Sequence, residues 1–288
     1  MAQQFDPEMH RQMGVEADVV LRVGMLLMGA GTSGYRVLRG MKRSARALGF
    51  DHLDATVGLT QITCTFHRGE YFRTVIARQH SPAVDASRIE ALEDLTHNRL
   101  YAGITAQELA AMLDTIEHNV KKRWGGLTLS FAAAIACAAF AYLNFFPLEA
   151  VGLVALAAFA GQFVRYTVLH RHVHQIGGVI AGGATASIVF FLLTEFFGAI
   201  GSVEPSELSS GFVAAVLFLI PGFPLFSALI DIARFDLDAG IVRLGYAFTV
   251  IFTAAFTVSM VSWLTKLSPE PPAPVQDMQW FLLAPMAS

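Results

Sequence analysis

The sequence has little charge for its length. Only 15% of its 288 residues are Asp, Glu, Lys or Arg, whereas 54% are hydrophobic. Together with a mean hydropathy of +0.51, this composition excludes an ordinary soluble domain and indicates a membrane protein. The formal net charge of −3 provides no basic excess for a phosphate backbone, so nucleic acid is excluded as a partner.

Cysteine is also scarce, and a leader pattern is missing. The two cysteines are Cys64, in a polar region, and Cys137, inside an apolar run, so we expect no disulfide framework. The first 14 residues contain early acidic residues and lack the apolar core of about 7 to 15 residues that is typical of a signal peptide. We therefore expect the N-terminal region to stay in the cytoplasm.

The charges that are present concentrate at one end of the chain. Residues 1–123 hold 15 of the 20 Lys and Arg and 14 of the 23 Asp and Glu. This contrast predicts a cytoplasmic domain over residues 1–123 and a transmembrane domain over residues 124–264. A Pro-rich tail over residues 265–288 ends in an apolar stretch that is too short to span a membrane.

Helix and strand patterns both occur in the predicted cytoplasmic domain. Apolar residues recur at helical spacing over residues 16–48, which predicts one long helix or two helices broken near Gly34. β-Branched and aromatic residues over 55–66 and 71–78 predict a hairpin around the turn-like sequence HRGE.

Two more helices are expected before residue 123. The first follows Asp85, and the second opens with a capping box in which Thr105 and Glu108 satisfy free backbone N–H groups. The order α-β-β-α-α predicts a small α+β domain.

Five apolar runs of about twenty residues follow, which is the length that a helix needs to cross the hydrocarbon core. The predicted spans cover residues 124–146, 148–169, 176–198, 209–231 and 242–264. We therefore expect a membrane all-α bundle of about five transmembrane helices after the α+β domain.

Charge in the connections predicts the orientation of this bundle. Loops that stay in the cytoplasm collect basic residues, and three connections do so through Lys121, Lys122, Arg123, Arg171, Arg234 and Arg243. The alternate connections contain acidic residues and no basic ones, namely Glu149, Glu204 and Glu207. An odd number of spans then places the N-terminus in the cytoplasm and the C-terminus on the outer face.

The fourth predicted span contains a helix-breaking sequence at its midpoint. Pro221 and Pro224 lack an N–H group and Gly222 tolerates unusual dihedral angles, so we expect a discontinuous helix. Broken helices at membrane depth form substrate sites in transporters, and the second half-helix would offer its N-terminus to a carboxylate, with Ser227 as a nearby donor. The alternative is a simple packing kink.

Ionisable residues within the apolar spans are further candidates for substrate binding or gating. Glu195 is a candidate proton or substrate ligand, or else its side chain reaches the outer interface. Arg165, near the inner end of the second span, is likewise either a substrate ligand or a side chain that reaches the membrane interface. Asp231 could pair with Arg234 at i+3, and with Arg243 these charges form either a cytoplasmic gate or a hydrated loop.

Three other motifs have a functional and a structural interpretation. The glycines of Gly29–Gly34 fit a dinucleotide fingerprint, which would require a strand before them, whereas the preceding pattern is helical. The structural interpretation is that these small residues let two helices approach closely. On a helix, His170 and His174 would share a face, but no Cys or carboxylate completes a metal site. The cluster with His172 is interpreted as a cytoplasmic anchor, with an anion-attracting vestibule as the alternative. We expect no cofactor and no metal.

The third motif is a row of small residues in the third span. Gly178, Gly182 and Ala186 are spaced by four, which predicts close packing of another helix.

Four segments resemble the threonine/serine exporter family. They read LLMGAGTSGYRVLRGMKRSARALGF, TAQELAAMLDTIE, VRYTVLHRHVHQIGG and IPGFPLFSALIDIARFDLDAGIVRL. The third is similar to the larger subunits of the two-component succinate exporters in that family. Fused members carry a second membrane half after the fifth span, so the resemblance implies a separate, smaller membrane subunit as partner.

The expected function is therefore secondary export by alternating access across the bacterial inner membrane. The resemblance implies a small carboxylate-bearing substrate, either a succinate-like dicarboxylate or threonine or serine. The lipid bilayer is the second partner, and homo-oligomers are compatible with the sequence. The alternative is a membrane-anchored sensor or assembly scaffold, and no residue pattern indicates an enzyme.

Overall fold

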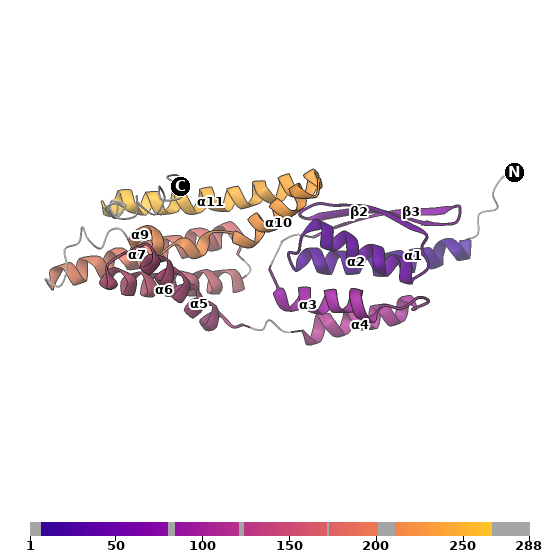
Figure 1. The fold of residues 1–288 in the computed structure, drawn as a ribbon, viewed down its shortest axis with the longest axis horizontal. Coiled ribbons are helices and arrows are strands. Elements are labelled where there is room, and N and C mark those ends of the chain that lie inside the picture. The colour runs from indigo at the N-terminus through magenta and orange to yellow at the C-terminus, as the bar shows by residue number, and fades with distance from the viewer. Residues whose placement is uncertain (1–6, 80–83, 121–123, 172, 201–210, 267–288) are drawn as a thin grey trace, which may run out of the picture. The chain divides into compact units, whose positions relative to one another are not determined.

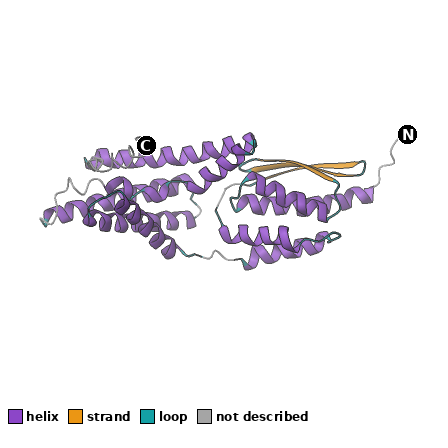
Figure 2. Ribbon diagram, in the orientation of Figure 1, coloured by secondary structure: helices purple, strands orange, loops and turns teal. Residues whose placement is uncertain are grey.

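The computed structural model describes residues 7–79, 84–120, 124–171, 173–200 and 211–266, which are mostly helical (Figures 1 and 2). The chain forms two compact units. The first lies within residues 1–123 and 221–248, and the second lies within residues 124–220 and 249–288. The predicted tail, apart from residues 265 and 266, lies outside the described residues. The predicted domain limits stay a prediction.

Two amphipathic helices form the centre of the first unit. Helix α1 (Pro7–Gly29) and helix α2 (Gly34–Ala47) are separated by a short loop, so the second of the two sequence alternatives is confirmed. The chain reverses at Gly31, whose φ of 89° is a left-handed value that favours glycine. The facing stripes of both helices are fully buried, as Leu27 and Met41 illustrate.

A three-stranded antiparallel sheet covers one face of these helices (Figure 1). Its order is β1 (His52–Val57), β2 (Gln61–Arg68) and β3 (Tyr71–Arg78). The prediction of a single strand over 55–66 is therefore wrong. Residues 58–60 turn the chain instead, and the Gly58 N–H donates to the Gln61 carbonyl at 2.8 Å. β-Branched residues on both sides of Gly58 hide this turn in the sequence.

Further helices cover the opposite face of α1 and α2 (Figure 1). They are α3 (Ala86–Asp94), a π-helical turn η1 (Leu95–Arg99) and α4 (Ala106–Asn119). The predicted capping box at Thr105 and Glu108 is confirmed, because each side chain bonds the other residue's backbone N–H. The buried sheet residue Cys64 remains a thiol, since burial raises its pKa to about 12.

The α10–α11 hairpin completes the first unit. Helix α10 (Gly222–Ala233) and residues 237–248 of α11 (Leu237–Thr265) belong to this unit, and α11 then continues into the second unit. Phe235, with a φ of 63°, lies in the turn between the two helices. This hairpin brings residues of the fourth and fifth predicted spans into the same unit as α2.

The second unit consists of long apolar helices. It contains α5 (Gly126–Leu143), α6 (Leu148–His170) and α7 (Gln175–Ala199), the short elements α9 (Gly211–Ala214) and η2 (Leu217–Leu219), and the remainder of α11. Helices α5, α6, α7 and α11 are each long and apolar enough to cross a membrane. A fifth candidate is the pair 211–219 and 222–233, which is bent at the break between its two parts.

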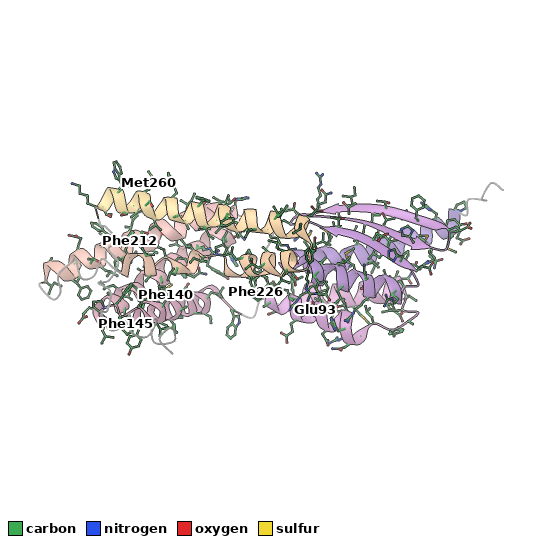
Figure 3. The ribbon with its side chains drawn as sticks, turned by 45° about the horizontal axis from the view of Figure 1, so that its top comes forward. Glu93, Phe140, Phe145, Phe212, Phe226 and Met260 are labelled. Carbon is green, nitrogen blue, oxygen red and sulfur yellow. The ribbon has the colours of Figure 1, made fainter. Side chains whose placement is uncertain are left out.

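The surface of the second unit is apolar, as expected for contact with lipid. Phe140, Phe145 and Met260 are among its exposed side chains, and Figure 3 labels them. Small and aromatic residues fill its interior, including Ala157, which is fully buried, and Phe212. The prediction of an apolar helical bundle is confirmed in this coarse form.

Helices α6 and α7 approach each other closely through small residues. A Cβ atom on Gly161 would lie 2.7 Å from the Gly182 carbonyl oxygen and 2.7 Å from the Ala186 Cβ. The predicted close-packing face of the third span is therefore confirmed, with Gly161 as its unpredicted counterpart on α6.

This contact predicts a site-specific loss of stability. Gly161→Val should lower the unfolding free energy of the detergent-purified protein by about 1–3 kcal/mol, because the added atoms force the two backbones apart. Gly152→Val is the matched control, since a Cβ on Gly152, in the same helix, meets nothing within 4 Å. Thermal unfolding measures both variants. Equal melting temperatures for the two would contradict the proposed packing.

The α4 capping box predicts an acid-dependent contribution to stability. Hydrogen bonds from the backbone and the hydroxyl of Thr105 lower the pKa of Glu108 below its ordinary 4.5. A lowered folded-state pKa stabilises the fold above pH 4.5, and this stability is lost as the pH falls further. Glu108→Gln cannot titrate, so its melting temperature should fall less between pH 5 and about pH 3 than that of the wild type. An equal fall in melting temperature for the variant and the wild type would show that the Glu108 carboxylate does not contribute to stability.

Candidate functional site

The eight candidate residues from the sequence divide between the two units. The first unit holds Pro221, Gly222, Pro224, Ser227, Asp231 and Arg243, and the second holds Arg165 and Glu195. Their surroundings differ enough to separate structural roles from candidate binding roles.

Pro221 and Gly222 mark the start of α10. Pro221 is the N-cap residue, with φ −80° and ψ 65°, and its carbonyl accepts from the Leu225 N–H at 3.1 Å. The buried Ser227 hydroxyl donates to the Pro224 carbonyl at 3.0 Å. Ser227 therefore uses its donor within α10, and its predicted role as a substrate donor would require this bond to break.

Arg165 lies on α6 and reaches the irregular backbone of η2. Its Nη1 donates to the Phe218 carbonyl at 3.5 Å. Backbone that leaves regular helix at membrane depth needs such a partner. This contact gives Arg165 a supporting role for the η2 backbone, and a role toward substrate stays a prediction.

Glu195 is exposed on α7, near its C-terminal end. Within the described ranges, its carboxylate has neither a hydrogen bond nor an ion pair. This exposure fits a side chain that extends toward the membrane interface, whereas a role in proton or substrate binding remains a prediction.

Asp231 and Arg243 form a buried ion pair between α10 and α11. The Arg243 Nε lies 3.3 Å from Asp231 Oδ2, and the two side chains are 4% and 0% exposed. Sequence spacing suggested a pair with Arg234 at i+3, and the structure gives Asp231 a different partner, twelve residues away. The short turn of the hairpin places these two residues opposite each other.

The same carboxylate caps helix α2. Asp231 Oδ2 accepts from the Gly34 N–H at 3.2 Å, and Oδ1 accepts from the Tyr35 N–H at 3.5 Å. The N-cap residue Ser33 makes no side-chain capping bond, so Asp231 takes over this function from a distant part of the chain. One carboxylate thus neutralises both a guanidinium and a helix N-terminus.

Arg243 also contacts the loop before α2. Its Nη1 donates to the Thr32 carbonyl at 2.6 Å. Its Nη2 is buried and has no hydrogen-bond partner in the part of the chain that the structure describes. Burying a guanidinium donor without an acceptor is energetically unfavourable, so Nη2 is the atom at which a further acceptor would bind.

Close approach around Gly34 explains why glycine occurs there. A Cβ on Gly34 would lie 3.2 Å from both the Ala239 Cβ and Asp236 Oδ2. Arg234 stacks on the Tyr35 ring at 3.8 Å from its centroid. The contacts of Thr32, Gly34 and Tyr35 with the hairpin were not predicted, although the small residues of Gly29–Gly34 did indicate close packing.

Two alternative sites are not supported by the fold. Helix α1 precedes Gly29–Gly34, so the strand that a dinucleotide fingerprint requires is replaced by a helix. His170 ends α6 and His174 precedes α7, so they do not share a helical face. His174 Nδ1 instead accepts from the Ile176 N–H at 3.3 Å, and His172 lies outside the described residues. No cluster of metal-ligating side chains is found among the described residues.

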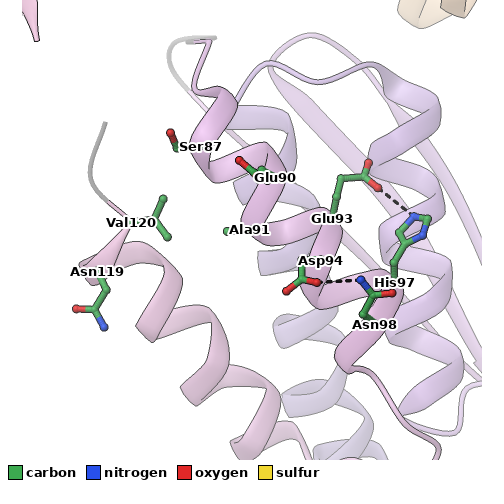
Figure 4. Close-up of a pocket in the computed structure, with 9 residues that line it drawn as sticks. All are labelled: Ser87, Glu90, Ala91, Glu93, Asp94, His97, Asn98, Asn119 and Val120. Atoms are coloured by element: carbon green, nitrogen blue, oxygen red, sulfur yellow. Dashed lines mark hydrogen bonds and ion pairs between the residues drawn. The ribbon is translucent and has the colours of Figure 1, made fainter. Parts of the chain in front are cut away.

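A surface pocket on the first unit contains several acidic side chains (Figure 4). Glu93 pairs with Arg39 at 2.8 Å and with His97 at 3.0 Å. Hydrogen bonds from Asn98 and then Arg99 lower the pKa of Asp94. These carboxylates already have partners within the chain, which favours a structural role for the pocket.

A second pocket, within the membrane unit, is lined almost entirely by apolar side chains. It lies between the α9–η2 segment and α11, and Leu219, Val258 and Trp263 are among its lining residues. Ser259 and Ser262 supply its polar groups. This lining suits an acyl chain or an apolar helix better than a carboxylate.

Known relatives cover most of the chain. Two curated proteins are both named "Probable succinate transporter subunit YjjP". The protein from Escherichia coli (strain K12) is 23% identical over 251 residues, covering 85% of this chain and 92% of that protein. The protein from Klebsiella aerogenes is 22% identical over 226 residues, covering 77% and 83%. No solved structure matches the chain.

The family comparison covers both units. The model of the threonine/serine exporter family (ThrE) matches residues 18–265, from within α1 to the last residue of α11. This range includes the buried Asp231–Arg243 pair, the α2 N-terminus and every candidate membrane span. The chain is therefore a multi-pass membrane protein that belongs to the threonine/serine exporter family.

Proposed function

We propose that this chain is one subunit of a secondary transporter that exports a small carboxylate-bearing metabolite across the bacterial inner membrane. Succinate or a similar dicarboxylate is the leading substrate, and threonine or serine is the second candidate. The transporter works by alternating access, with the N-terminus in the cytoplasm and the C-terminus on the outer face.

The interruption of the fourth apolar segment is the observation that carries this proposal. Residues 211–233 are long enough to span the membrane once, yet they divide into α9, η2 and α10 around Pro221 and Gly222. We interpret them as one discontinuous span, which leaves backbone groups free to bind a solute at membrane depth. Arg165 supports this interpretation by donating to the Phe218 carbonyl just before the break.

The energetics favour a dicarboxylate. A dianion that leaves a negative-inside cell gains roughly 2.3 kcal/mol per charge per 100 mV, so its export needs no titrating group. A zwitterion such as threonine gains nothing from the potential and needs coupling, for instance to protons. Glu195 is exposed and Asp231 is ion-paired, so neither lies in the setting expected of a buried proton carrier.

A second, smaller membrane subunit is part of the proposal. Both curated relatives are named as subunits, which supports an assembly of more than one chain. The expected partner supplies the second membrane half that fused members of the family carry. The apolar pocket between the α9–η2 segment and α11 is one surface that such a helix could cover.

The alternative function is a membrane-anchored sensor or assembly scaffold. The three-layered first unit is large enough to bind a regulator, and the apolar helices would then serve as an anchor. An anchor gains nothing from an interrupted helix, however, and this difference separates the two functions experimentally.

Export of labelled succinate and labelled threonine from preloaded vesicles tests the proposal. We expect efflux of succinate when this chain is present together with its smaller subunit, and none with either chain alone. Efflux of threonine instead would assign the second candidate substrate. Normal assembly of both chains without efflux of either solute would contradict the exporter function and favour the scaffold.

The interrupted segment predicts a specific transport defect. Replacing Pro221 and Pro224 by Ala and Gly222 by Leu should abolish efflux while the protein still assembles, because a continuous helix satisfies the backbone groups that bind the solute. Pro147→Ala is the control, since Pro147 precedes α6 as its N-cap residue and interrupts no helix. Unchanged efflux by the triple variant would show that the break is a packing kink.

A further inference from the structure

The buried guanidinium of Arg243 has unused hydrogen-bonding capacity. Among the described residues, only its Nη1 makes a well-formed bond, to the Thr32 carbonyl at 2.6 Å. Nη2 is buried without an acceptor among the described residues, and Nε lies 3.3 Å from Asp231 Oδ2 without the geometry of a hydrogen bond. The Nε–Nη2 edge, which normally binds a carboxylate through two parallel bonds, is therefore only partly used.

The reason is that Asp231 is shared. Its Oδ2 also accepts from the Gly34 N–H at 3.2 Å, and its Oδ1 accepts from the Tyr35 N–H at a long 3.5 Å. One carboxylate thus serves two groups that each attract an anion, the guanidinium and the N-terminus of the 14-residue helix α2. Neither group is fully satisfied by it.

We propose that Arg243 and the N-terminus of α2 form a carboxylate-binding site, and that Asp231 is a tethered competitor for it. A carboxylate of the transported solute binds the Nε–Nη2 edge of Arg243, and Asp231 retains the α2 N–H groups or leaves the site. This inference rests on the proposed function, because it assigns that function's substrate class to specific groups. Arg243 precedes most of the fifth predicted span, so the site belongs to the predicted cytoplasmic end.

The surrounding charges favour one incoming anion at a time. Asp236 adds a second negative charge beside Gly34, since its Oδ2 lies 3.2 Å from the position of a Gly34 Cβ. Arg234, stacked on Tyr35, adds a second positive charge. The local balance of two acids and two bases is therefore neutral, and an added carboxylate is accommodated only when Asp231 gives up its contact with Arg243.

Binding to the purified full chain tests this site directly. The probes are succinate, its neutral diamide and inorganic phosphate, and the readouts are the dissociation constant and the shift in melting temperature. Asp231→Asn should bind succinate about tenfold more tightly than the wild type, or better, because one competing charge-assisted contact is removed. Succinate should also restore part of the thermal stability that this variant loses, whereas the diamide should not.

Matched variants separate a binding role from a general charge effect. Arg243→Gln and Arg243→Lys should each lose succinate binding by tenfold or more, since Lys retains the charge without the planar fork. Asp238→Asn makes the same charge change as Asp231→Asn on the same hairpin at an exposed position, and it should bind succinate like the wild type. If Asp231→Asn does not fold, the Arg243→Lys comparison alone decides the assignment.

Several results would overturn the assignment. Succinate binding that is equal in Arg243→Gln and the wild type would show that the carboxylate binds elsewhere. Phosphate binding as tight as that of succinate would remove the assignment to carboxylates. If the Arg243 variants lose binding while the two-subunit vesicles show no efflux, the exporter function fails and the site stands. Efflux from the two-subunit vesicles, together with unchanged succinate binding in the Arg243 variants, would support the exporter function and overturn the site.

Discussion

A buried guanidinium and a buried carboxylate hold together three segments that are far apart in the sequence. Asp231 and Arg243 connect α10 to α11, and both contact residues 32–35 at the start of α2. Removing one member of such a pair leaves an isolated buried charge, which typically costs about 3–5 kcal/mol. The pair therefore strongly couples the α10–α11 hairpin to the start of helix α2. Any movement of α10 or α11 must keep these charges paired or provide a new partner.

The same requirement for satisfied polar groups governs the membrane unit. Its long helices satisfy their own backbone and present apolar side chains outward, whereas the α9–η2 segment leaves regular helix. Arg165 supplies a donor to that segment. The proposed transport pathway thus includes two places where backbone groups lack a partner within their own helix. These are the break at Pro221 and Gly222 and the N-terminus of α2. Both offer hydrogen-bonding groups that a carboxylate can use.

Sequence patterns predicted those features that depend on local chemistry. The long apolar runs, the capping box at Thr105 and the row of small residues in α7 each follow from neighbouring residues on one element, and the structure contains all three. The β1–β2 turn was missed because Gly58 alone marks it. The pairing of Asp231 with Arg243, and with Gly34 about two hundred residues earlier, depends on how distant segments pack, which residue spacing along one helix cannot reveal.

Current measurement in reconstituted liposomes tests the central claim most directly. Liposomes that contain this chain and its smaller subunit are adsorbed on a supported membrane and exposed to a jump in succinate concentration. The account predicts a transient current that carries negative charge with the solute, that is absent with succinamide and that is strongly reduced by Arg243→Lys. A succinate-dependent flux without current, or no response in correctly assembled liposomes, would contradict the account.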